Sequence, residues 1–511
     1  MYVIGLDIGT TSTKASIFAK TGRFIASAAV GYPIIHPQPD WAEQDPDAIY
    51  SAVLESVRSA IISAKIDAGE LLGIGISSAM HSIMAVDENG KPLTNSIIWA
   101  DNRSWKYAEE LKAQPLGTEI YLKTGTPIHP MSPLSKLLWM KNEQPELFSK
   151  THKWISIKEY ITWKWFGEYF VDYSIASATG LFNLRYLDWD EQVLELLGLH
   201  RDKFSKPVPT TAINRNMDGD AATAMGIPAD LPVVAGASDG VLANLGAGAI
   251  SEGEYSVTIG TSGAIRTVVS GPTLDPLGRT FCYYLADRKW VIGGPVNNGG
   301  IALRWFKDQF CLQEDSSAAE PTFDLMIEEA SRVPAGAGGL LFLPYLSGER
   351  APLWNANTRG AFFGISLTHR REHFIRAVLE GVIYAVYSVG VILEEIAGPG
   401  KELHVSGGFA RSEVWRQILA DIFGKTVEVP ESHESSGFGA AVMALHALGH
   451  IGSLEEVKQM INIQLRQTPF QENKEIYRTM HNVYQNLTRD MLGHFNTLSE
   501  IQRKGFKWIR A

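Results

Sequence analysis

Cysteine is almost absent from this chain, whose 511 residues include two, Cys282 and Cys311. Small secreted domains that depend on disulfides carry many more, so we expect a protein of a reducing compartment. The two cysteines also lack the spacing of zinc ligands, and no zinc site is expected from them. The N-terminus does not show the basic and apolar segments of a signal peptide, and we therefore expect a cytoplasmic location.

Long apolar runs and an excess of positive charge are also missing. The longest apolar run, residues 381–393, is shorter than the ~20 residues that a membrane span needs, so it predicts a buried core helix. The 46 Lys and Arg residues are outnumbered by 56 Asp and Glu, which gives a net charge of -10. We therefore expect neither a nucleic-acid nor a membrane partner. The 45% hydrophobic and 20% charged composition is typical of a globular protein, and the length suits two domains.

Short β-prone segments alternate with helical patterns, which indicates an α/β fold. Residues 2–6 and 72–77 are apolar runs expected to form strands. Residues 46–64 have a helical pattern, and Asp45 stands before them as the expected N-cap.

Two segments about half a chain apart resemble each other. Residues 6–14 and 257–265 both contain Ile-Gly-Thr, followed by small hydroxyl residues, within a strand–turn–strand pattern. A repeat on this scale predicts two similar domains. We place these domains at residues 1–245 and 246–452, with residues 453–511 as a helical extension of the second.

The two glycine-hydroxyl turns are candidate phosphate sites, at residues 9–12 and 260–263. Backbone N–H groups and hydroxyls exposed in such turns can surround phosphate oxygens. Either turn alone could be an ordinary hairpin, but two in equivalent positions favour a nucleotide held by both domains. Other phosphate signatures fail, because Leu419 stands where a P-loop ending at residues 424–426 needs glycine, and no Gly-x-Gly-x-x-Gly is complete.

Asp239 is the candidate catalytic carboxylate. It follows the apolar strand 232–236, and ligands of α/β sheets bind at the carboxyl ends of such strands. There it could accept a proton from a substrate hydroxyl, although a helix N-cap is the structural alternative. Residues 236–240 also fit the Gly-x-Ser-x-Gly turn of an α/β-hydrolase with Ser238 as nucleophile. That hydrolase would leave the duplicated turns unexplained, and no His-Gly-Gly-Gly loop precedes Ser238.

Two glycine pairs, Gly299-Gly300 and Gly407-Gly408, stand at expected helix starts. Helix N-termini that a ligand can approach closely suit a phosphate or a nucleoside. A tight packing turn between strand and helix would require the same glycines.

Two long patterns resemble the signatures of the FGGY carbohydrate kinases. Residues 131–143 fit the first signature throughout, and residues 360–380 fit the second. Together with the first hydroxyl turn and Gly407-Gly408, the resemblance covers essentially the whole chain. It implies α/β domains of the duplicated actin-like ATPase (ribonuclease H-like) kind, facing a central cleft. It also implies a polyol in the N-terminal half and ATP in the C-terminal half, with Mg²⁺ as the metal.

The family pattern implies a role for each matching position. Asp239 is expected to be the general base, and Asp7 to reach Mg²⁺ through water. The residues expected at the terminal phosphate are Thr10, Thr11, Ser12 and Lys14; those at the sugar are Met80, His81, Arg103, Met131, Asp239 and Gly240; those around ATP are Thr261, Gly300, Arg304, Gly408 and Ser412.

Within the family the chain looks most like the gluconate kinases, on residues 77–82, 99–103, 124–131, 236–242 and 294–300. Xylulose kinases usually have Asp-Asn where this chain has Asp239-Gly240, but another sugar or polyol such as xylulose remains the alternative substrate. A sugar acid needs a cation or strong donors, so we expect His81 and Arg103 to help hold its carboxylate. Arg103 could instead pair with Asp101. A non-catalytic sugar sensor with the actin fold is the remaining alternative to a kinase. A homodimer is compatible with both.

Overall fold

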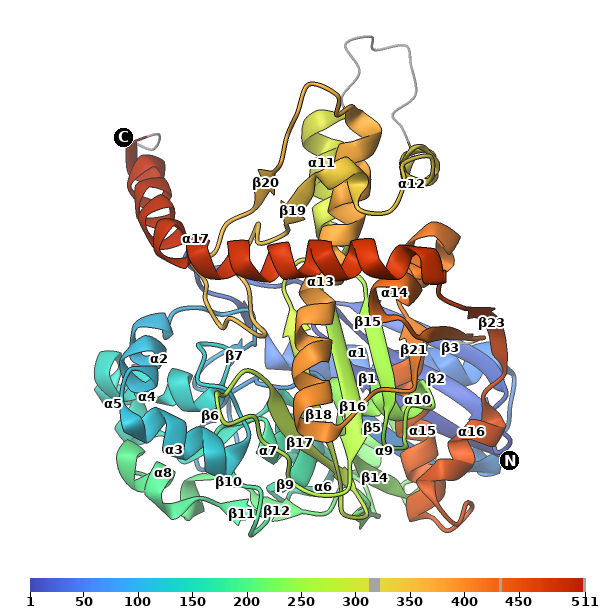
Figure 1. The fold of residues 1–511 in the computed structure, drawn as a ribbon. Coiled ribbons are helices and arrows are strands. Elements are labelled where there is room, and N and C mark those ends of the chain that lie inside the picture. Colours follow the sequence, from blue (N-terminus) through green and yellow to red (C-terminus); the bar gives the residue numbers. More distant parts are fainter. Residues whose placement is uncertain (312–321, 432–433, 509–511) are drawn as a thin grey trace. The chain divides into compact units, whose positions relative to one another are not determined.

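The computed structural model describes residues 1–311, 322–431 and 434–508 (Figure 1). The chain folds into two compact units. Unit 1 comprises Met1–Ser251, Val268–Ile292 and Glu434–Asn462, and unit 2 comprises Glu252–Thr267, Gly293–His433 and Ile463–Ala511. The compact units therefore differ from the consecutive segments 1–245, 246–452 and 453–511. The physical reason is that apolar side chains from two later segments belong to the buried core of unit 1.

Unit 1 contains a six-stranded sheet in the order β13-β14-β5-β1-β2-β3. Strands β1, β5 and β14 run parallel, whereas the β1–β2, β2–β3 and β13–β14 pairs are antiparallel. The carboxyl ends of the three parallel strands are therefore neighbours. The strand bounds are β1 Tyr2–Ile8, β2 Ser12–Ala19, β3 Phe24–Gly31, β5 Leu71–Ser78, β13 Ile213–Asn214 and β14 Val233–Ser238.

Helices cover both faces of this sheet. Helix α1 (Pro46–Ala64) packs on β2 and β3, and Asp45 caps it as expected by accepting the N–H groups of the first turn. Helix α15 (Ser435–Ala447) packs on β1 and β5 and against α10 (Asp239–Gly246). The contact is so close that a Cβ on Gly5 would lie 1.8 Å from the carbonyl oxygen of Gly437. Glycine is therefore required at position 5 for α15 to reach the sheet.

The second large sheet has seven strands in the order β17-β18-β16-β15-β21-β22-β23. Six of them, β18-β16-β15-β21-β22-β23, repeat the order β3-β2-β1-β5-β14-β13 of unit 1. In both sheets an antiparallel hairpin stands beside two parallel strands and an antiparallel edge strand. This repetition confirms the duplicated α/β fold. The strand bounds are β15 Glu254–Ile259, β16 Gly263–Val269, β17 Phe281–Ala286, β18 Lys289–Val296, β21 Glu402–Ser406, β22 Thr426–Pro430 and β23 Ile463–Gln467.

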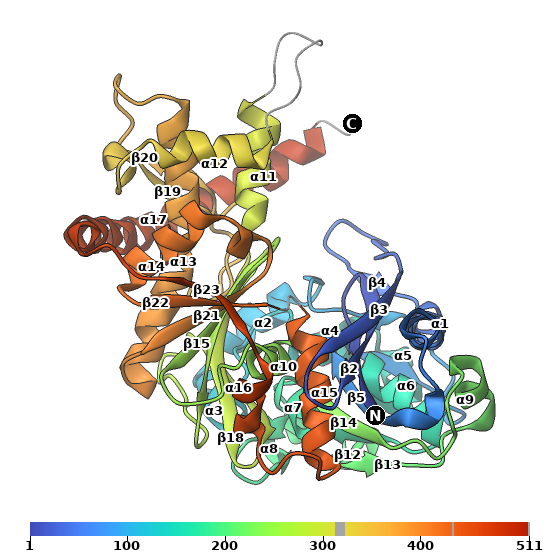
Figure 2. The same cartoon turned by 90° about the vertical axis from the view of Figure 1, so that its right-hand side faces the viewer.

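The longest apolar run lies in α13 (Arg371–Ala397), in unit 2. This helix is long and apolar enough to cross a membrane, but 83% of its most apolar window is buried within the protein. It packs against α11 (Gly300–Phe310), α12 (Phe323–Ser331), α14 (Glu413–Phe423) and α17 (Lys474–Trp508). Figure 2 shows α13 and α14 beside α17. The run is thus the buried core helix that its length predicts.

Candidate active site

Two carboxylates, Asp7 and Asp239, stand at the carboxyl ends of parallel strands in unit 1. The register places Asp7 beside Ser77, and Ser78 beside Ser238, the residue before Asp239. Burial and the negative charge of Asp239 raise the pKa of Asp7 to about 6, against the lowering effect of a hydrogen bond from Ser77. The two carboxylates disfavour each other's negative charge, and burial adds to this effect. A cation bound between them would stabilise both in the ionised form.

Asp239 is the first residue of α10, and its Oδ1 accepts a 2.6 Å hydrogen bond from the backbone N–H of Gly240. The N-cap position belongs to Ser238, whose side chain makes no capping bond. Ser238 is fully buried, and its hydroxyl lies 3.1 Å from that of Ser174. A hydrolase nucleophile has to be exposed to its substrate, so the buried Ser238 argues against the hydrolase.

The β1–β2 turn presents the expected hydroxyl groups. The N–H of Gly9 donates to the carbonyl of Ser12 over 3.0 Å and closes the turn. Thr11 is exposed, while Oγ1 of Thr10 accepts a 2.9 Å hydrogen bond from the indole of Trp99. Because a hydroxyl can donate while it accepts, Thr10 can still offer its proton to a phosphate oxygen.

Lys14 lies directly across the β1–β2 pair from Asp7. Its ammonium lowers the pKa of Asp7, but by less than burial and Asp239 raise it. The same ammonium forms a 2.9 Å ion pair with Glu434, at a partly exposed position. The cation expected at the terminal phosphate is therefore shared with a carboxylate that the sequence did not single out.

The sugar-side residues His81 and Met131 are tied together by Lys136. The Lys136 ammonium donates to the backbone carbonyls of His81 over 2.9 Å and Met131 over 2.6 Å. Complete burial lowers the pKa of Lys136 to about 7. His81 has a φ of 69° and its Nε2 lies 2.9 Å from the Tyr283 hydroxyl. Met80, the preceding residue, is half-buried. Lys136 thus supports the positive φ of His81, a backbone conformation that residues other than glycine rarely adopt.

Arg103 is buried between two carboxylates. Its Nε and Nη2 donate to Asp101 over 2.8–2.9 Å, and Nη2 also donates to Glu43 over 2.5 Å. The guanidinium carbon lies 3.7 Å from the centroid of the Trp41 ring. The pairing with Asp101, the alternative left open by the sequence, is therefore present, and the charge of Arg103 is already balanced within the protein.

Unit 2 contains a cavity of about 610 Å³ that is lined by all five residues expected around ATP. Its volume lies within the range of roughly 300–1,000 Å³ common for small-molecule sites. The five are Thr261, Gly300, Arg304, Gly408 and Ser412. Further side chains, which were not expected from the sequence, complete the wall: Phe323, Asp324 and Ile327 of α12, Arg411 just before α14, and Glu413, Val414 and Trp415 at the start of α14. No local motif marks these residues, since α12 and α14 have ordinary amphipathic patterns.

The glycine pairs at the helix starts have different roles. A Cβ on Gly299 or Gly300 would lie 2.6 or 2.8 Å from a carbonyl oxygen of the β15–β16 turn, so this pair permits tight packing. A Cβ on Gly407 would likewise lie 2.4 Å from the carbonyl of Ile259. Gly408 differs, because a Cβ there would meet nothing within 4 Å, and it borders the cavity. Gly408 therefore leaves space that a ligand can use.

A duplicated α/β fold with a hydroxyl turn, a carboxylate pair and a nucleotide-sized cavity defines a phosphotransferase of the actin-like ATPase class. Residues 2–246 match the N-terminal domain, and residues 255–448 the C-terminal domain, of the FGGY family of carbohydrate kinases. The chain belongs to this family and is a carbohydrate kinase.

Individual relatives match over almost their whole length. The chain is 50% identical over 506 residues to a gluconokinase of Bacillus subtilis (strain 168), covering 98% of each chain. It is also similar to crystal structures of a gluconate kinase and of a ligand-bound xylulose kinase, both from Lactobacillus acidophilus. Each of the two has 36% identity and a TM-score of 0.93, with 97% of this chain and 99% of that chain covered.

Membership of the family implies ATP as a substrate and, typically, Mg²⁺. The residues present fit both. The Asp7–Asp239 pair suits a cation, and Gly260 and Gly408 have no atom within 4 Å of an added Cβ at the edge of the unit 2 cavity. A phosphate or nucleoside could approach the backbone closely at both glycines.

Proposed function

We propose that this chain transfers the terminal phosphoryl group of ATP to D-gluconate and forms 6-phospho-D-gluconate. The observation that carries the substrate is the 50% identity to a gluconokinase over 98% of both chains. The solved structures do not separate the substrates, because equal likeness is found to a gluconate kinase and to a xylulose kinase. Xylulose or another polyol is the second candidate.

In the proposed reaction Asp239 acts as general base. The acceptor hydroxyl loses its proton to the Asp239 carboxylate as its oxygen attacks the phosphorus atom. The hydrogen bond from the Gly240 N–H fixes the orientation of that carboxylate. Bound Mg²⁺ would neutralise charge on the phosphates, held by Asp7 directly or through water.

Phosphate and nucleotide binding are proposed for the two sets of residues described above. In unit 1, Thr10, Thr11 and Ser12 would donate hydroxyl hydrogen bonds, and Lys14 would add positive charge. In unit 2, the cavity beside Thr261, Gly300, Arg304, Gly408 and Ser412 would take the nucleoside part of ATP. Its walls include the aromatic residues Phe323 and Trp415, which suit a planar base.

The sugar site is proposed at Met80, His81, Met131 and Gly240, which follow the strand ends or their supporting loops. Arg103 is proposed to act on gluconate by holding this loop region in place, because Asp101 and Glu43 already balance its charge. His81 stays a candidate for direct contact with the sugar acid.

We also propose a cytoplasmic location, which the scarcity of cysteine supports. A homodimer is proposed as well, and light scattering on the purified protein tests it.

A substrate screen tests the proposal. The purified protein is incubated with ATP and Mg²⁺ and with gluconate, xylulose, ribulose, glycerol or fuculose, and ADP release is followed. We expect kcat/KM to be highest for gluconate and ADP release to be lost in Asp239→Asn. A wide preference for xylulose would overturn the substrate while leaving the kinase in place. No ADP release with any acceptor would favour the non-catalytic sensor.

A further inference from the structure

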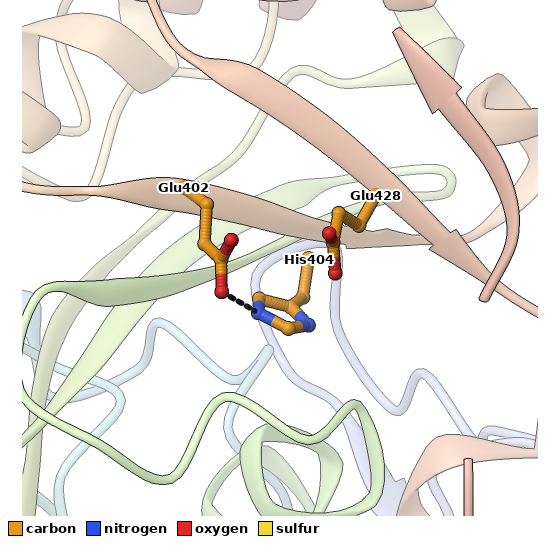
Figure 3. A group of neighbouring side chains, drawn as sticks. All are labelled: Glu402, His404 and Glu428. Atoms are coloured by element: carbon orange, nitrogen blue, oxygen red, sulfur yellow. Dashed lines mark hydrogen bonds and ion pairs between the residues drawn. The ribbon is translucent and has the colours of Figure 1, made fainter. Parts of the chain in front are cut away.

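A second group of charged side chains lies in unit 2, on the strands β21 and β22. These strands are parallel neighbours, and the register places His404 opposite Glu428. Glu402 precedes His404 by two residues and therefore lies on the same face of the sheet. Figure 3 shows the three side chains gathered on that face. One ligand atom from each residue can be chosen so that all lie within 4.8 Å of one another.

His404 is 6% exposed and carries an unsatisfied nitrogen. Its Nε2 lies 3.3 Å from Oε1 of Glu402. Its Nδ1 is buried, has no hydrogen-bond partner among the described residues, and lies on the Glu428 side of the ring (Figure 3). A neutral imidazole has one N–H, so one of its nitrogens presents a lone pair to a carboxylate. A cation bound among the three side chains would give the unpartnered nitrogen a partner.

Two neighbouring features bear on this group: a guanidinium that contacts Glu428, and the partial exposure of Glu402 to solvent. Arg466 donates to Oε1 of Glu428 from Nε over 2.7 Å and from Nη2 over 2.6 Å. Hydrogen bonds of this kind commonly orient a carboxylate that binds metal through its other oxygen. Both contacts of Arg466 go to Oε1 of Glu428, so they do not occupy Oε2. Glu402 is partly exposed and connects the group with solvent.

We propose that Glu402, His404 and Glu428 form a binding site for a divalent cation of the Zn²⁺ type. One nitrogen of His404 and one oxygen of each glutamate would hold the ion, with water in the fourth position. A mixed nitrogen and oxygen set suits Zn²⁺, whereas Mg²⁺ prefers oxygen ligands.

The geometry is close to that of a zinc site. Bonds of about 2.1 Å in a tetrahedron place neighbouring ligand atoms about 3.4 Å apart. The 3.3 Å between Nε2 of His404 and Oε1 of Glu402 already matches that separation. The ligand atoms of all three residues lie within 4.8 Å of one another, so the glutamate side chains would have to move closer together to bind the ion. This site is separate from the Mg²⁺ of phosphoryl transfer and does not rest on the proposed function.

Metal analysis of the full-length protein tests the site. The protein is treated with EDTA, dialysed against micromolar Zn²⁺ with an excess of Mg²⁺, and analysed by mass spectrometry for bound zinc. We expect one equivalent in the wild type and its loss in His404→Gln. The matched control is His446→Gln, because Nε2 of His446 pairs with Asp287 over 2.7 Å and its Nδ1 also has no hydrogen-bond partner among the described residues. Among the described residues this ring pairs with one carboxylate, that of Asp287, so the control should retain the zinc.

Diffraction at the zinc absorption edge locates the ion in wild-type crystals, which keeps the test valid if His404→Gln does not fold. An anomalous peak among Glu402, His404 and Glu428 is expected. Absence of bound zinc, equal binding by His404→Gln, or a peak elsewhere alone would overturn the proposal. A doubly protonated His404 ring in a zinc-free wild type, seen by nitrogen NMR in the presence of Zn²⁺, would show that a proton takes the place of the metal.

Discussion

The hydroxyl of Ser77 donates a 2.6 Å hydrogen bond to Oδ1 of Asp7. This bond favours the ionised form of Asp7, yet burial and the charge of Asp239 outweigh it and raise the pKa to about 6. At neutral pH the protein therefore holds Asp7 ionised in an unfavourable place. A bound cation would stabilise the ionised form of Asp7. Without the cation, the unfavourable ionisation should lower the free energy of unfolding, which can be measured without an assay of turnover.

Asp7→Asn should remove a pH-dependent loss of stability. Because the pKa in the folded protein is about 6 and the ordinary value is 3.8, the contribution of Asp7 is fully present below pH 3.8 and is lost as the pH rises through about 6. The free energy of unfolding of the wild type should fall relative to the variant by up to about 3 kcal/mol over that window. Urea titrations of both proteins without Mg²⁺, from pH 4 to pH 8, measure the difference. A flat difference would contradict the raised pKa.

Asp239→Asn should fold normally and lose turnover by about 10²–10⁴-fold. The amide oxygen can still accept the hydrogen bond from Gly240, but it cannot take a proton from the sugar. Circular dichroism and ADP release measure the two effects. The control is Ser238→Ala, which removes the neighbouring hydroxyl and should leave turnover close to normal. The opposite pattern would mean that Asp239 is not the general base.

Lys136→Met should weaken sugar binding. Two buried carbonyls, of His81 and Met131, would lose their donor, at a cost of about 1–3 kcal/mol each. We expect a several-fold higher KM for the sugar and an unchanged KM for ATP. Because the pKa of Lys136 is about 7, the KM for the sugar should change more between pH 6 and pH 8 in the wild type than in the variant.

The control for Lys136→Met is Lys141→Met on the same helix, α4 (Pro133–Glu143). Lys141 also donates to a backbone carbonyl, that of Leu196, over 3.0 Å. It should leave both KM values unchanged. Equal effects of the two substitutions would mean that Lys136 only stabilises the fold.

Arg103→Leu should reduce activity on gluconate and on a neutral polyol by the same factor. The substitution leaves Asp101 buried without its partner, which typically destabilises a protein by about 3–5 kcal/mol. Thermal unfolding and kcat/KM for both acceptors measure the two effects. A loss confined to gluconate would instead assign Arg103 to the substrate carboxylate.

Gly408→Ala should raise the KM for ATP and leave that for the sugar unchanged. The added methyl group meets no protein atom within 4 Å and enters the unit 2 cavity. Gly219→Ala is the control, because a Cβ at Gly219 also meets nothing within 4 Å and Gly219 does not line the cavity. Unchanged ATP kinetics in Gly408→Ala would place the nucleotide elsewhere.

Local patterns predicted the parts of the fold that depend on neighbours in sequence. The Asp45 cap and the two hairpins with their hydroxyl turns follow from backbone hydrogen bonding within a few residues. The five residues expected around ATP line one cavity, because each lies in a motif at a helix start or a turn. The aromatic and charged wall from α12 and α14 could not be predicted, since it depends on how distant helices pack. The same holds for the contact of Lys136 with the backbone of His81, 55 residues away.

The interleaved units also bear on synthesis at the ribosome. Domains generally fold as units, the N-terminal one first as the chain emerges. Unit 1 cannot be completed in that order, because Phe438 and Val442 of α15 share a buried cluster with Val3 and Val241. The nascent sheet of residues 1–251 therefore keeps an apolar face uncovered until more than 430 residues have been made. During that interval this face is the surface on which a chaperone would act.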